Sequence, residues 1–401
     1  MNTAILALDI ALSVIGMGLL VLALVLLIQV LAAVWPGQTR GTAFDDVQRP
    51  PIAVLVPAHD EELGIEPVLA AVRAGLTAQD RVLVVADNCT DNTAAVARAA
   101  GAEVVERFDT SLVGKGYALD FGIRHLAARA PDVVIVIDAD CLVEADALDR
   151  LARSCKASAR PVQALYFMHA PPHAGSKQRI AEFAWIVKNQ VRALGYHRLG
   201  LPCQLMGTGM AFPWAILERA PVASGHIVED LQLGLDLAEA GTPPVFCPEA
   251  VVRSSFPART DSQETQRTRW EHGHLGVIAK IGPKLLMSAL RRGDMRLAAM
   301  ALDVCVPPIA ALVLALLMST TVAALVAPLG SGVPLVLSGT ALGLVVAAIA
   351  IAWHRFGRAV VSFTDLMGAP LYAMRKAPLY ARMLGRRQTE WVRTRRDDRP
   401  N

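Results

Sequence analysis

Three long apolar stretches stand out along the chain, one near its start and two near its end. The first carries no charge from Ile10 to Ile28, and its apolar character continues to Trp35. The other two cover residues 297–326 and 333–353. Because about 20 apolar residues suffice to cross a bilayer, we expect three transmembrane helices. No basic segment precedes the first stretch, which favours a retained helix over a cleaved signal peptide.

Between the first two stretches, short apolar runs alternate with amphipathic segments, a pattern typical of a βαβ sheet. The fourth run, V-V-I-V-I, contains only β-branched residues and predicts a strand buried on both faces, as in a parallel sheet. The predicted strands cover residues 52–56, 81–85, 102–106, 133–137 and 162–168. A long helix is expected over residues 177–199. The sequence therefore predicts an α/β domain.

Polar side chains follow directly after four of the predicted strands. Because the carboxyl ends of the strands form the ligand-binding edge of an open α/β sheet, we expect these side chains to gather there. Two carboxylates flanking a small residue suit a hard divalent cation, and a lysine between two glycines before a helix suits a phosphate. Taken singly, the acid pair could equally cap a helix, and the lysine could belong to an ordinary loop. Together they predict a nucleotide site formed by Asp60 and Glu61, Asp87, Lys115, and Asp138 with Asp140.

The next candidates, in the second half of the chain, are ambiguous when each is taken alone. Residues 207–210, G-T-G-M, suit either a close approach of backbone or substrate, or a tight turn. Glu229 and Asp230 open an amphipathic helix, where an acid usually only compensates the helix dipole. The two interpretations of residues 207–210 are equally open, whereas the acid pair taken by itself favours dipole compensation.

A polar helix starting near Asp261 carries the segment Q-R-T-R-W. At helical spacing Gln266, Arg269 and Trp270 share one face. An amide, a forked guanidinium and a broad aromatic ring side by side suit a diphosphate and a sugar. The two histidines that follow, at positions 272 and 274, are interpreted as interfacial or structural.

Composition and charge indicate a membrane protein whose α/β domain lies on the cytosolic side. The chain has 401 residues, of which 54% are hydrophobic, and its net charge of +3 points to no nucleic-acid partner. Its six cysteines lack any C-x-x-C spacing, which fits reduced thiols. Basic residues flank the last two apolar stretches at 291–296 and 354–358, while their connector is uncharged, so we expect both outer ends in the cytosol.

The C-terminal part is less regular. Residues 360–374 are apolar but short and broken by Asp365, Gly368 and Pro370, so they predict an interfacial or re-entrant segment. The arginine-rich tail at 382–399 suits an anchor on anionic lipid, a lid over the site, or both.

In this order, the motifs P-A-H-D-E-E, D-N-C-T-D-N-T, G-K-G-Y-A-L, D-A-D, E-D and Q-R-T-R-W resemble the membrane-bound family 2 glycosyltransferases. Within that group the chain looks most like the cellulose, hyaluronan, poly-N-acetylglucosamine and chitooligosaccharide synthases. The resemblance covers about residues 50–275 and is carried by six motifs in sequence. One position departs from the pattern, because Val228 precedes the E-D pair where a threonine is common.

The resemblance implies a GT-A fold, which is a Rossmann-like mixed sheet with flanking helices, joined to transmembrane and interfacial helices. It implies inverting transfer from a UDP-sugar with Mg²⁺ or Mn²⁺. Asp87 matches the acid that reads uracil, Asp138 and Asp140 match the metal and diphosphate acids, and Asp230 matches the catalytic base. The residues assigned to nucleotide binding are Asp60, Glu61, Asp87, Lys115 and Asp138.

Gln266, Arg269 and Trp270 match the motif that holds the diphosphate and caps the acceptor channel. The implied domains are an N-terminal transmembrane helix (1–36), a cytosolic GT-A domain (50–260), interfacial helices (261–296), two transmembrane helices (297–354), and an interfacial segment with a basic tail (355–401).

We therefore expect a hexosyltransferase in the cell inner membrane, with its catalytic domain in the cytoplasm, that extends a polysaccharide or oligosaccharide. Three spans are few for a closed channel, so a second copy of the chain or an export partner would complete it. Two alternatives stay open: addition of a single sugar to a lipid-linked acceptor, and a non-catalytic nucleotide-binding subunit of a secretion complex.

Overall fold

The computed structural model describes residues 3–36, 44, 46–257 and 260–380, with the side chains of residues 260–267 left out. The described residues form two compact units. The described residues of the helical unit are 3–36, 172–200 and 271–380. Those of the other unit are 44, 46–171, 201–257 and 260–270; we call it the catalytic unit, after the role that the resemblance implies. Residues 172–200, which lie inside the range expected for the GT-A domain, are grouped with the helical unit. The predicted basic tail lies outside the described residues.

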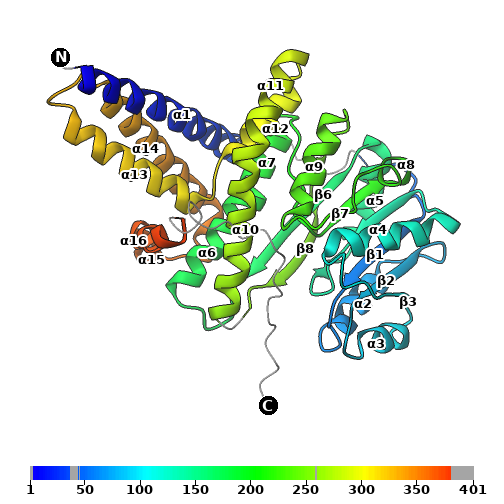
Figure 1. The fold of residues 1–401 in the computed structure, drawn as a ribbon. Coiled ribbons are helices and arrows are strands. Elements are labelled where there is room, and N and C mark those ends of the chain that lie inside the picture. The colour runs from blue at the N-terminus through cyan, green and yellow to red at the C-terminus, as the bar shows by residue number, and fades with distance from the viewer. Residues whose placement is uncertain (1–2, 37–43, 45, 258–259, 381–401) are drawn as a thin grey trace. The chain divides into compact units, whose positions relative to one another are not determined.

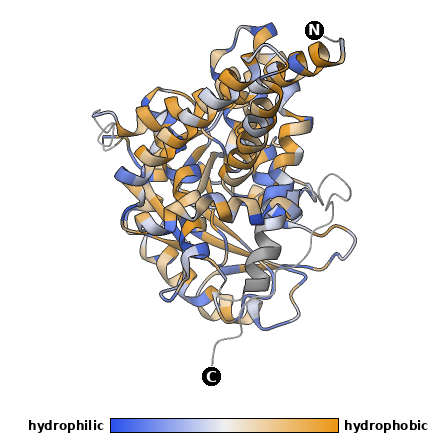
Figure 2. Ribbon diagram, turned by 90° about the vertical axis from the view of Figure 1, so that its left-hand side faces the viewer, coloured by the Kyte–Doolittle hydropathy of each residue, from blue (hydrophilic) through white to orange (hydrophobic). Residues whose placement is uncertain are grey.

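Three helices of the helical unit are long and apolar enough to cross a membrane (Figure 1): α1 (Thr3–Val34), α13 (Ile309–Val326) and α14 (Val333–Ala352), the last continuing through the π-helical turn η3 (Trp353–Gly357). In their most apolar windows only 28%, 22% and 28% of the residues are buried. Hydrophobic residues run along the helices of this unit (Figure 2). Such uncovered apolar surface fits helices that face lipid.

The apolar stretch at 297–326 is not one helix. Helix α12 (Met295–Cys305) ends before Pro307 and Pro308, and α13 begins directly after them. A proline ring clashes with the preceding helical turn and its nitrogen has no hydrogen to donate. The candidate span is therefore α13 alone.

A buried polar network joins three elements of the helical unit. The predicted long helix is observed as α6 (Ser176–Ile186), the π-helical stretch η2 (Val187–Arg192) and α7 (Ala193–Arg198). Arg192 at the end of η2 forms an ion pair with Asp303 of α12 at 2.7 Å. Gln29 of α1 donates to the Asp303 carboxylate at 2.6 Å and accepts from Arg192 Nε at 3.2 Å. We call Gln29, Arg192 and Asp303 the Arg192 network.

The remaining elements of the helical unit are α11 (Gly282–Arg292), α15 (Phe363–Met367) and α16 (Ala369–Arg375). Helix α10 (Thr260–Lys280) belongs partly to each unit. The segment predicted as interfacial or re-entrant thus forms two short helices, α15 and α16, and neither is long enough to cross a bilayer.

The catalytic unit is built on an eight-stranded mixed sheet with the strand order β3-β2-β1-β4-β7-β6-β8-β5. Strands β1, β2, β3 and β4 are mutually parallel, and β7 is antiparallel to β4 and β6. The strands are β1 (Ile52–Ala58), β2 (Arg81–Asp87), β3 (Glu103–Arg107), β4 (Val133–Val136), β5 (Leu142–Val143), β6 (Val162–His169), β7 (Met210–Pro213) and β8 (Val245–Ser255). The predicted α/β fold is confirmed, and five of these strands were expected.

Helices cover this sheet and bury its central strands. Every residue of β4 is buried, as the V-V-I-V-I pattern predicted. The helices are α2 (Ile65–Ala74), α3 (Thr93–Ala99), α4 (Lys115–Leu126), η1 (Ala127–Arg129), α5 (Ala147–Ser158), α8 (Trp214–Leu217) and α9 (Glu229–Glu239). Leu55, Val85 and Val136 from the strands share one core cluster with Leu119 of α4 and Leu233 of α9. This cluster fixes the first turns of α4 and α9 relative to the strand ends.

Candidate functional site

Three neighbouring parallel strands carry acids at one edge of the sheet. Val56 of β1 pairs with Val84 of β2, and Leu55 of β1 pairs with Val136 of β4, so the strands run in step. Asp60 and Glu61 follow β1, Asp87 ends β2, and Asp138 and Asp140 follow β4. Because the strands are parallel, these acids emerge at the same edge, where open α/β sheets bind their ligands.

The D-A-D segment presents its carboxylates as a group. The ligand atoms of Asp138, Asp140 and Cys141 all lie within 4.8 Å of one another. The backbone N–H of Asp138 donates to the hydroxyl of Thr208 at 3.1 Å, and Ser254 donates to the backbone carbonyl of Asp140 at 3.2 Å. The loop that carries the acids is thus held by Thr208, which lies just before β7, and by Ser254, near the end of β8.

This donor set fits a hard divalent cation. Burial first, and then the charges of Asp140 and Asp138, raise the pKa of the Cys141 thiol well above its usual value. A thiol that keeps its proton is a poor metal ligand. The two carboxylates remain, and carboxylate oxygens with added phosphate oxygens are what Mg²⁺ and Mn²⁺ prefer. Asp138 and Asp140 are therefore the residues that could hold the predicted metal.

Lys115 points into this group of acids. Its ammonium lies 2.5 Å from Asp138 Oδ1 and donates to the carbonyl oxygen of Gly207 at 2.7 Å. Burial alone would lower the pKa of Lys115, but the charges of Asp138 and Glu229 outweigh burial and raise it. Lys115 therefore stays a cation among these acids, and its role in nucleotide binding stays a prediction.

The two glycines around Lys115 explain how it comes to point there. Gly114 has φ of +140°, a conformation that side chains rarely adopt. A Cβ on Gly116 would lie 2.5 Å from the carbonyl oxygen of Ser224 and 2.6 Å from that of Val222. Only glycine lets the 222–224 loop pass so close to the start of α4.

The first turn of α9 brings two more acids to the same place. Gly207 has φ of +92°, and a Cβ placed on it would lie 3.4 Å from Asp230 Oδ2 and 3.8 Å from Lys115 Nζ. Burial and the negative charge of Asp230 raise the pKa of Glu229 to about 7, against the opposing effect of Lys115. The backbone of Gly207 thus lies beside Asp230 and Lys115, while a close approach that only glycine allows is found at Gly209, where a Cβ would lie 2.7 Å from the Cβ of Ala164.

Arg269 contributes a second cation. Burial lowers the pKa of its guanidinium, while the carboxylates of Glu229 and Asp138 act in the opposite direction. The guanidinium therefore lies within electrostatic reach of both acids. We call Asp138, Asp140, Glu229 and Asp230, with Lys115 and Arg269, the acid cluster. Trp270 next to Arg269 is half-buried, and the side chain of Gln266 lies outside the described residues.

A second group of polar residues surrounds Asp87, at the end of the next strand. Arg107 Nη1 lies 2.6 Å from Asp87 Oδ1, and both residues are buried. Arg107 also donates to the carbonyl oxygen of Leu112 at 2.8 Å, and its guanidinium lies 5.8 Å from the centre of the Tyr117 ring. Burial raises the pKa of Asp87, although the ion pair with Arg107 opposes this effect. The site thus contains an oriented acid with a cation and an aromatic ring beside it.

Asp60 and Glu61 connect loops of the same sheet edge. The backbone N–H of Thr90 donates to Asp60 Oδ1 at 2.7 Å, and the backbone N–H of Glu61 donates to the hydroxyl of Thr93 at 2.7 Å. Asp60 has φ of +52° and lies with Cys89 and Asp91 in a second group of close ligand atoms. Their observed contacts hold the β1 and β2 loops together.

Sequence reasoning missed two residues of this region. Arg107 ends a short strand and gave no motif of its own, although a basic residue 20 positions after Asp87 is visible in the sequence. Glu229 entered only as part of the E-D motif and was given no role of its own. Only the fold shows that Glu229 is crowded by other carboxylates.

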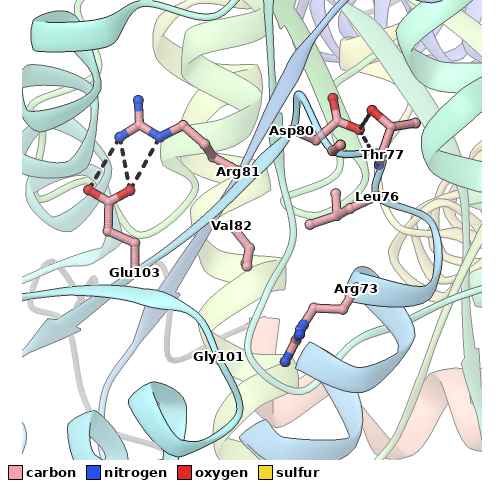
Figure 3. Close-up of a pocket in the computed structure, with 9 residues that line it drawn as sticks. Arg73, Leu76, Thr77, Asp80, Arg81, Val82, Gly101 and Glu103 are labelled. Carbon is pink, nitrogen blue, oxygen red and sulfur yellow. Dashed lines mark hydrogen bonds and ion pairs between the residues drawn. The ribbon is translucent and has the colours of Figure 1, made fainter.

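A cavity of about 430 Å³ opens at the other end of β2 and β3 (Figure 3). Arg81 binds Glu103 at 2.9 Å, and Asp80 accepts from the backbone N–H of Thr77 at 2.7 Å. Arg73 donates to the carbonyl oxygen of Ala100. Each charged side chain that lines this cavity has a partner, and the cavity lies at the amino ends of the strands, so we do not assign the predicted site to it.

Comparisons with known proteins bear on the catalytic unit first. A family model described as glycosyltransferase like family 2 matches residues 50–273. Uncharacterized glycosyltransferases of Mycobacterium bovis and Mycobacterium tuberculosis are 31% identical to the chain over 194 residues, which is 42% of this chain and 82% of theirs.

One solved structure has a similar fold, and a second matches less of the chain. Mannosyltransferase PcManGT from Pyrobaculum calidifontis, in complex with GDP-Man and Mn²⁺, has a TM-score of 0.56 at 21% identity, over 91% of this chain and 98% of that one. Glucosyl-3-phosphoglycerate synthase from Mycobacterium tuberculosis, in complex with Mn²⁺, UDP and phosphoglyceric acid, has a TM-score of 0.39 at 23% identity, over 60% and 84%.

Proposed function

The chain belongs to the glycosyltransferase-like family 2, and from this premise we propose that it transfers a hexose from a UDP-sugar to a growing polysaccharide or oligosaccharide at a membrane. The observation that carries the proposal is the acid cluster at the carboxyl edge of the sheet. Four carboxylates face two cations there, Lys115 and Arg269. Such a cluster has an excess of negative charge that a divalent cation would neutralise.

The cations and acids suit a diphosphate leaving group. A Mg²⁺ or Mn²⁺ ion held by Asp138 and Asp140 would supply charge neutralisation for the departing diphosphate. Lys115 and Arg269 add fixed positive charge on the protein side, and fixed charges cost no reorganisation when the diphosphate leaves. Arg269 offers a fork of N–H donors that matches phosphate oxygens.

Asp230 is our candidate for the general base. In the proposed step the acceptor hydroxyl gives its proton to the Asp230 carboxylate while its oxygen forms a bond to the anomeric carbon. The bond from that carbon to the diphosphate oxygen breaks, and its electron pair leaves with UDP. Attack from the side opposite the leaving group inverts the anomeric centre. Trp270 and Gln266 are proposed to hold the acceptor and diphosphate from the same helix.

Asp87 is our candidate for reading the nucleobase. A carboxylate accepts hydrogen bonds, so it suits the N–H edge of uracil. The ion pair with Arg107 orients this carboxylate, and the Tyr117 ring lies beside the Arg107 guanidinium. Guanine also has an N–H edge, and PcManGT is complexed with GDP-Man. Binding of UDP and GDP to the chain and to an Arg107→Ala variant would therefore test this assignment.

The three candidate spans favour a place in the cell inner membrane with the catalytic unit in the cytoplasm, where UDP-sugars are made. Their basic flanks support this orientation. The same small number of spans favours the second candidate, a transferase that adds one sugar to a lipid-linked acceptor.

The test is a panel of UDP-sugars offered to the purified full chain in detergent with Mn²⁺. We expect one of them to release UDP in the presence of acceptor and to yield a ladder of products. One added sugar would favour the single-addition enzyme, and no release from any nucleotide sugar would contradict the proposal.

A further inference from the structure

Gln163 of β6 is a buried polar residue that lies outside the six motifs. Its exposed fraction is 0%. The side-chain amide donates to the carbonyl oxygens of Thr208 at 2.9 Å and Ala164 at 2.8 Å. Its oxygen accepts from the backbone N–H of Met206 at 2.8 Å. Two of these three hydrogen bonds thus bind the segment 206–208, which leads into β7.

The amide of Gln163 takes the place of a strand partner for this segment. Strand β7 begins at Met210, where it pairs with Gln163. Just before it, Gly207 and Gly209 have φ of +92° and +65°, which turn the backbone away from a regular strand. A side-chain amide carries the same donor and acceptor as a peptide group, so it can pair with backbone that has left the ladder.

The segment that Gln163 binds holds two members of the acid cluster in turn. The hydroxyl of Thr208, a residue with 0% exposure, accepts from the backbone N–H of Asp138 at 3.1 Å. The carbonyl oxygen of Gly207 accepts from Lys115 at 2.7 Å. Hydrogen bonds therefore run from Gln163, through one stretch of backbone, to a predicted metal ligand and to the cation beside it.

We propose that Gln163 is a positioning residue for the acid cluster. It fixes residues 206–208 so that Thr208 holds Asp138 and Gly207 holds Lys115 at the predicted diphosphate site. The competing explanation is that the buried amide stabilises the fold and nothing more. The inference rests on the proposed function for its effect on UDP binding, whereas the hydrogen-bond chain can be tested without any ligand.

Three substitutions separate the steps of this chain. Gln163→Met keeps a side chain of similar length but removes all the hydrogen bonds of the amide. Thr208→Val keeps the shape of the side chain and removes the acceptor for the Asp138 N–H, whereas Thr208→Ser keeps that hydroxyl. Gln232→Met on α9 is the matched control, because it also removes a glutamine amide, one that donates to Asp236 at 2.7 Å.

Amide hydrogen exchange of the full chain in detergent, read by mass spectrometry of its peptides, follows the chain of bonds directly. In Gln163→Met, peptides that contain Met206 and Asp138 should both exchange about tenfold faster, the effect of losing roughly one hydrogen bond. In Thr208→Val the peptide with Asp138 should change and Met206 should stay protected. Thr208→Ser and Gln232→Met should match the unmodified chain at both places.

Unchanged exchange at Asp138 in Gln163→Met would overturn the inference, because Gln163 would then hold its own neighbours alone. If Gln163→Met does not fold, Gln163→Asn takes its place. That variant keeps an amide but shortens the side chain by one carbon, so the amide is drawn back from Met206 and Thr208. The same outcomes are expected of it.

Titration of UDP in the presence of Mn²⁺ is the second readout, at a temperature where each variant is folded. Gln163→Met and Thr208→Val should bind UDP about tenfold more weakly, while Thr208→Ser and Gln232→Met should bind as the unmodified chain does. If the unmodified chain binds UDP with Mn²⁺ and Gln163→Met binds it equally well, Gln163 serves the fold alone. If the exchange results hold and the unmodified chain shows no such binding, the hydrogen-bond chain stands and the proposed chemistry fails.

Discussion

The two charged clusters of this protein are built from the same residue types but differ in balance. The Arg192 network pairs one acid with one base, and Gln29 forms a hydrogen bond with each of them. The acid cluster sets four carboxylates against Lys115 and Arg269, and the pKa values of Asp138 and Glu229 are raised. A balanced, buried cluster is complete without a ligand, whereas an unbalanced one is completed by a ligand.

The difference predicts that changes in the acid cluster affect binding and turnover, and that changes in the Arg192 network affect folding. The largest effect is expected for Asp230→Asn, which removes the proposed base. Turnover should fall by about 10²–10⁴-fold, the usual contribution of a general base, while UDP affinity changes little.

Asp236→Asn is the matched control for that variant. Asp236 lies on the same helix and accepts a hydrogen bond from Gln232 at 2.7 Å. Its turnover should stay near that of the unmodified chain. Unchanged turnover in Asp230→Asn would remove Asp230 from the mechanism.

In the Arg192 network, Asp303→Ala leaves a buried guanidinium without its counter-charge. Removal of one partner of a buried ion pair costs about 3–5 kcal/mol, so the melting temperature in detergent should fall clearly. Asp294→Ala, at the start of the same helix, removes an N-cap that accepts from two backbone N–H groups. That change should cost about 1 kcal/mol. Equal melting temperatures for the two variants, or weaker UDP binding by either in the folded protein, would contradict the comparison.

Lys115→Gln should shift two affinities in opposite directions. Without the ammonium at 2.5 Å from Asp138, Mn²⁺ alone should bind about tenfold more tightly, because a competing cation is gone. UDP should bind more weakly, because a positive charge near the diphosphate is lost. Lys156→Gln is the control, since Lys156 is exposed and pairs only with Asp132 among the described ion pairs. Both affinities, measured by calorimetry, should move; a shift of the same sign in both would sink the assignment.

The smallest effect is expected in the pH dependence of stability, where Glu229→Gln is compared with the unmodified chain. Glu229 has its pKa raised from 4.5 to about 7 in the folded state by burial and by Asp230. The folded chain therefore holds more protons than the unfolded chain between those values, and stability falls as pH rises through this window. In Glu229→Gln this fall in stability should be absent. Curves of melting temperature against pH should therefore diverge between the variant and the unmodified chain from pH 4.5 to 7. Parallel curves would show that Glu229 does not titrate there.

The parts of the fold that could be predicted are those with a local signature. Strand β4 follows from five β-branched residues in a row, and the acids after β1, β2 and β4 follow from strand ends. Strands β5, β7 and β8 were missed, because their pairing and burial depend on partners far along the chain. Pairings such as Gln29 with Asp303, 274 residues apart, are likewise set by tertiary packing.

The candidate site shows the same limit. The D-A-D segment could be found in the sequence because two carboxylates one residue apart after a buried strand suit a divalent cation, and the structure brings Asp138 and Asp140 together. Their role as metal ligands stays a prediction. Arg107 and Glu229 could not be found in this way, because an arginine at a strand end and an acid at a helix start are common in any protein. The roles considered for these residues follow from their buried neighbours. Arg107 pairs with Asp87, and Glu229 lies near the other acids of the cluster.

The central claim is that acids far apart in the chain form one metal-dependent diphosphate site. The most direct test titrates UDP against the full chain and against Asp140→Ala, with and without Mn²⁺, and uses Asp132→Ala, at the other end of β4, as the control. We predict that Mn²⁺ tightens UDP binding by the unmodified chain and by Asp132→Ala, but not by Asp140→Ala. Equal UDP affinities in all three proteins, with or without Mn²⁺, would contradict the claim.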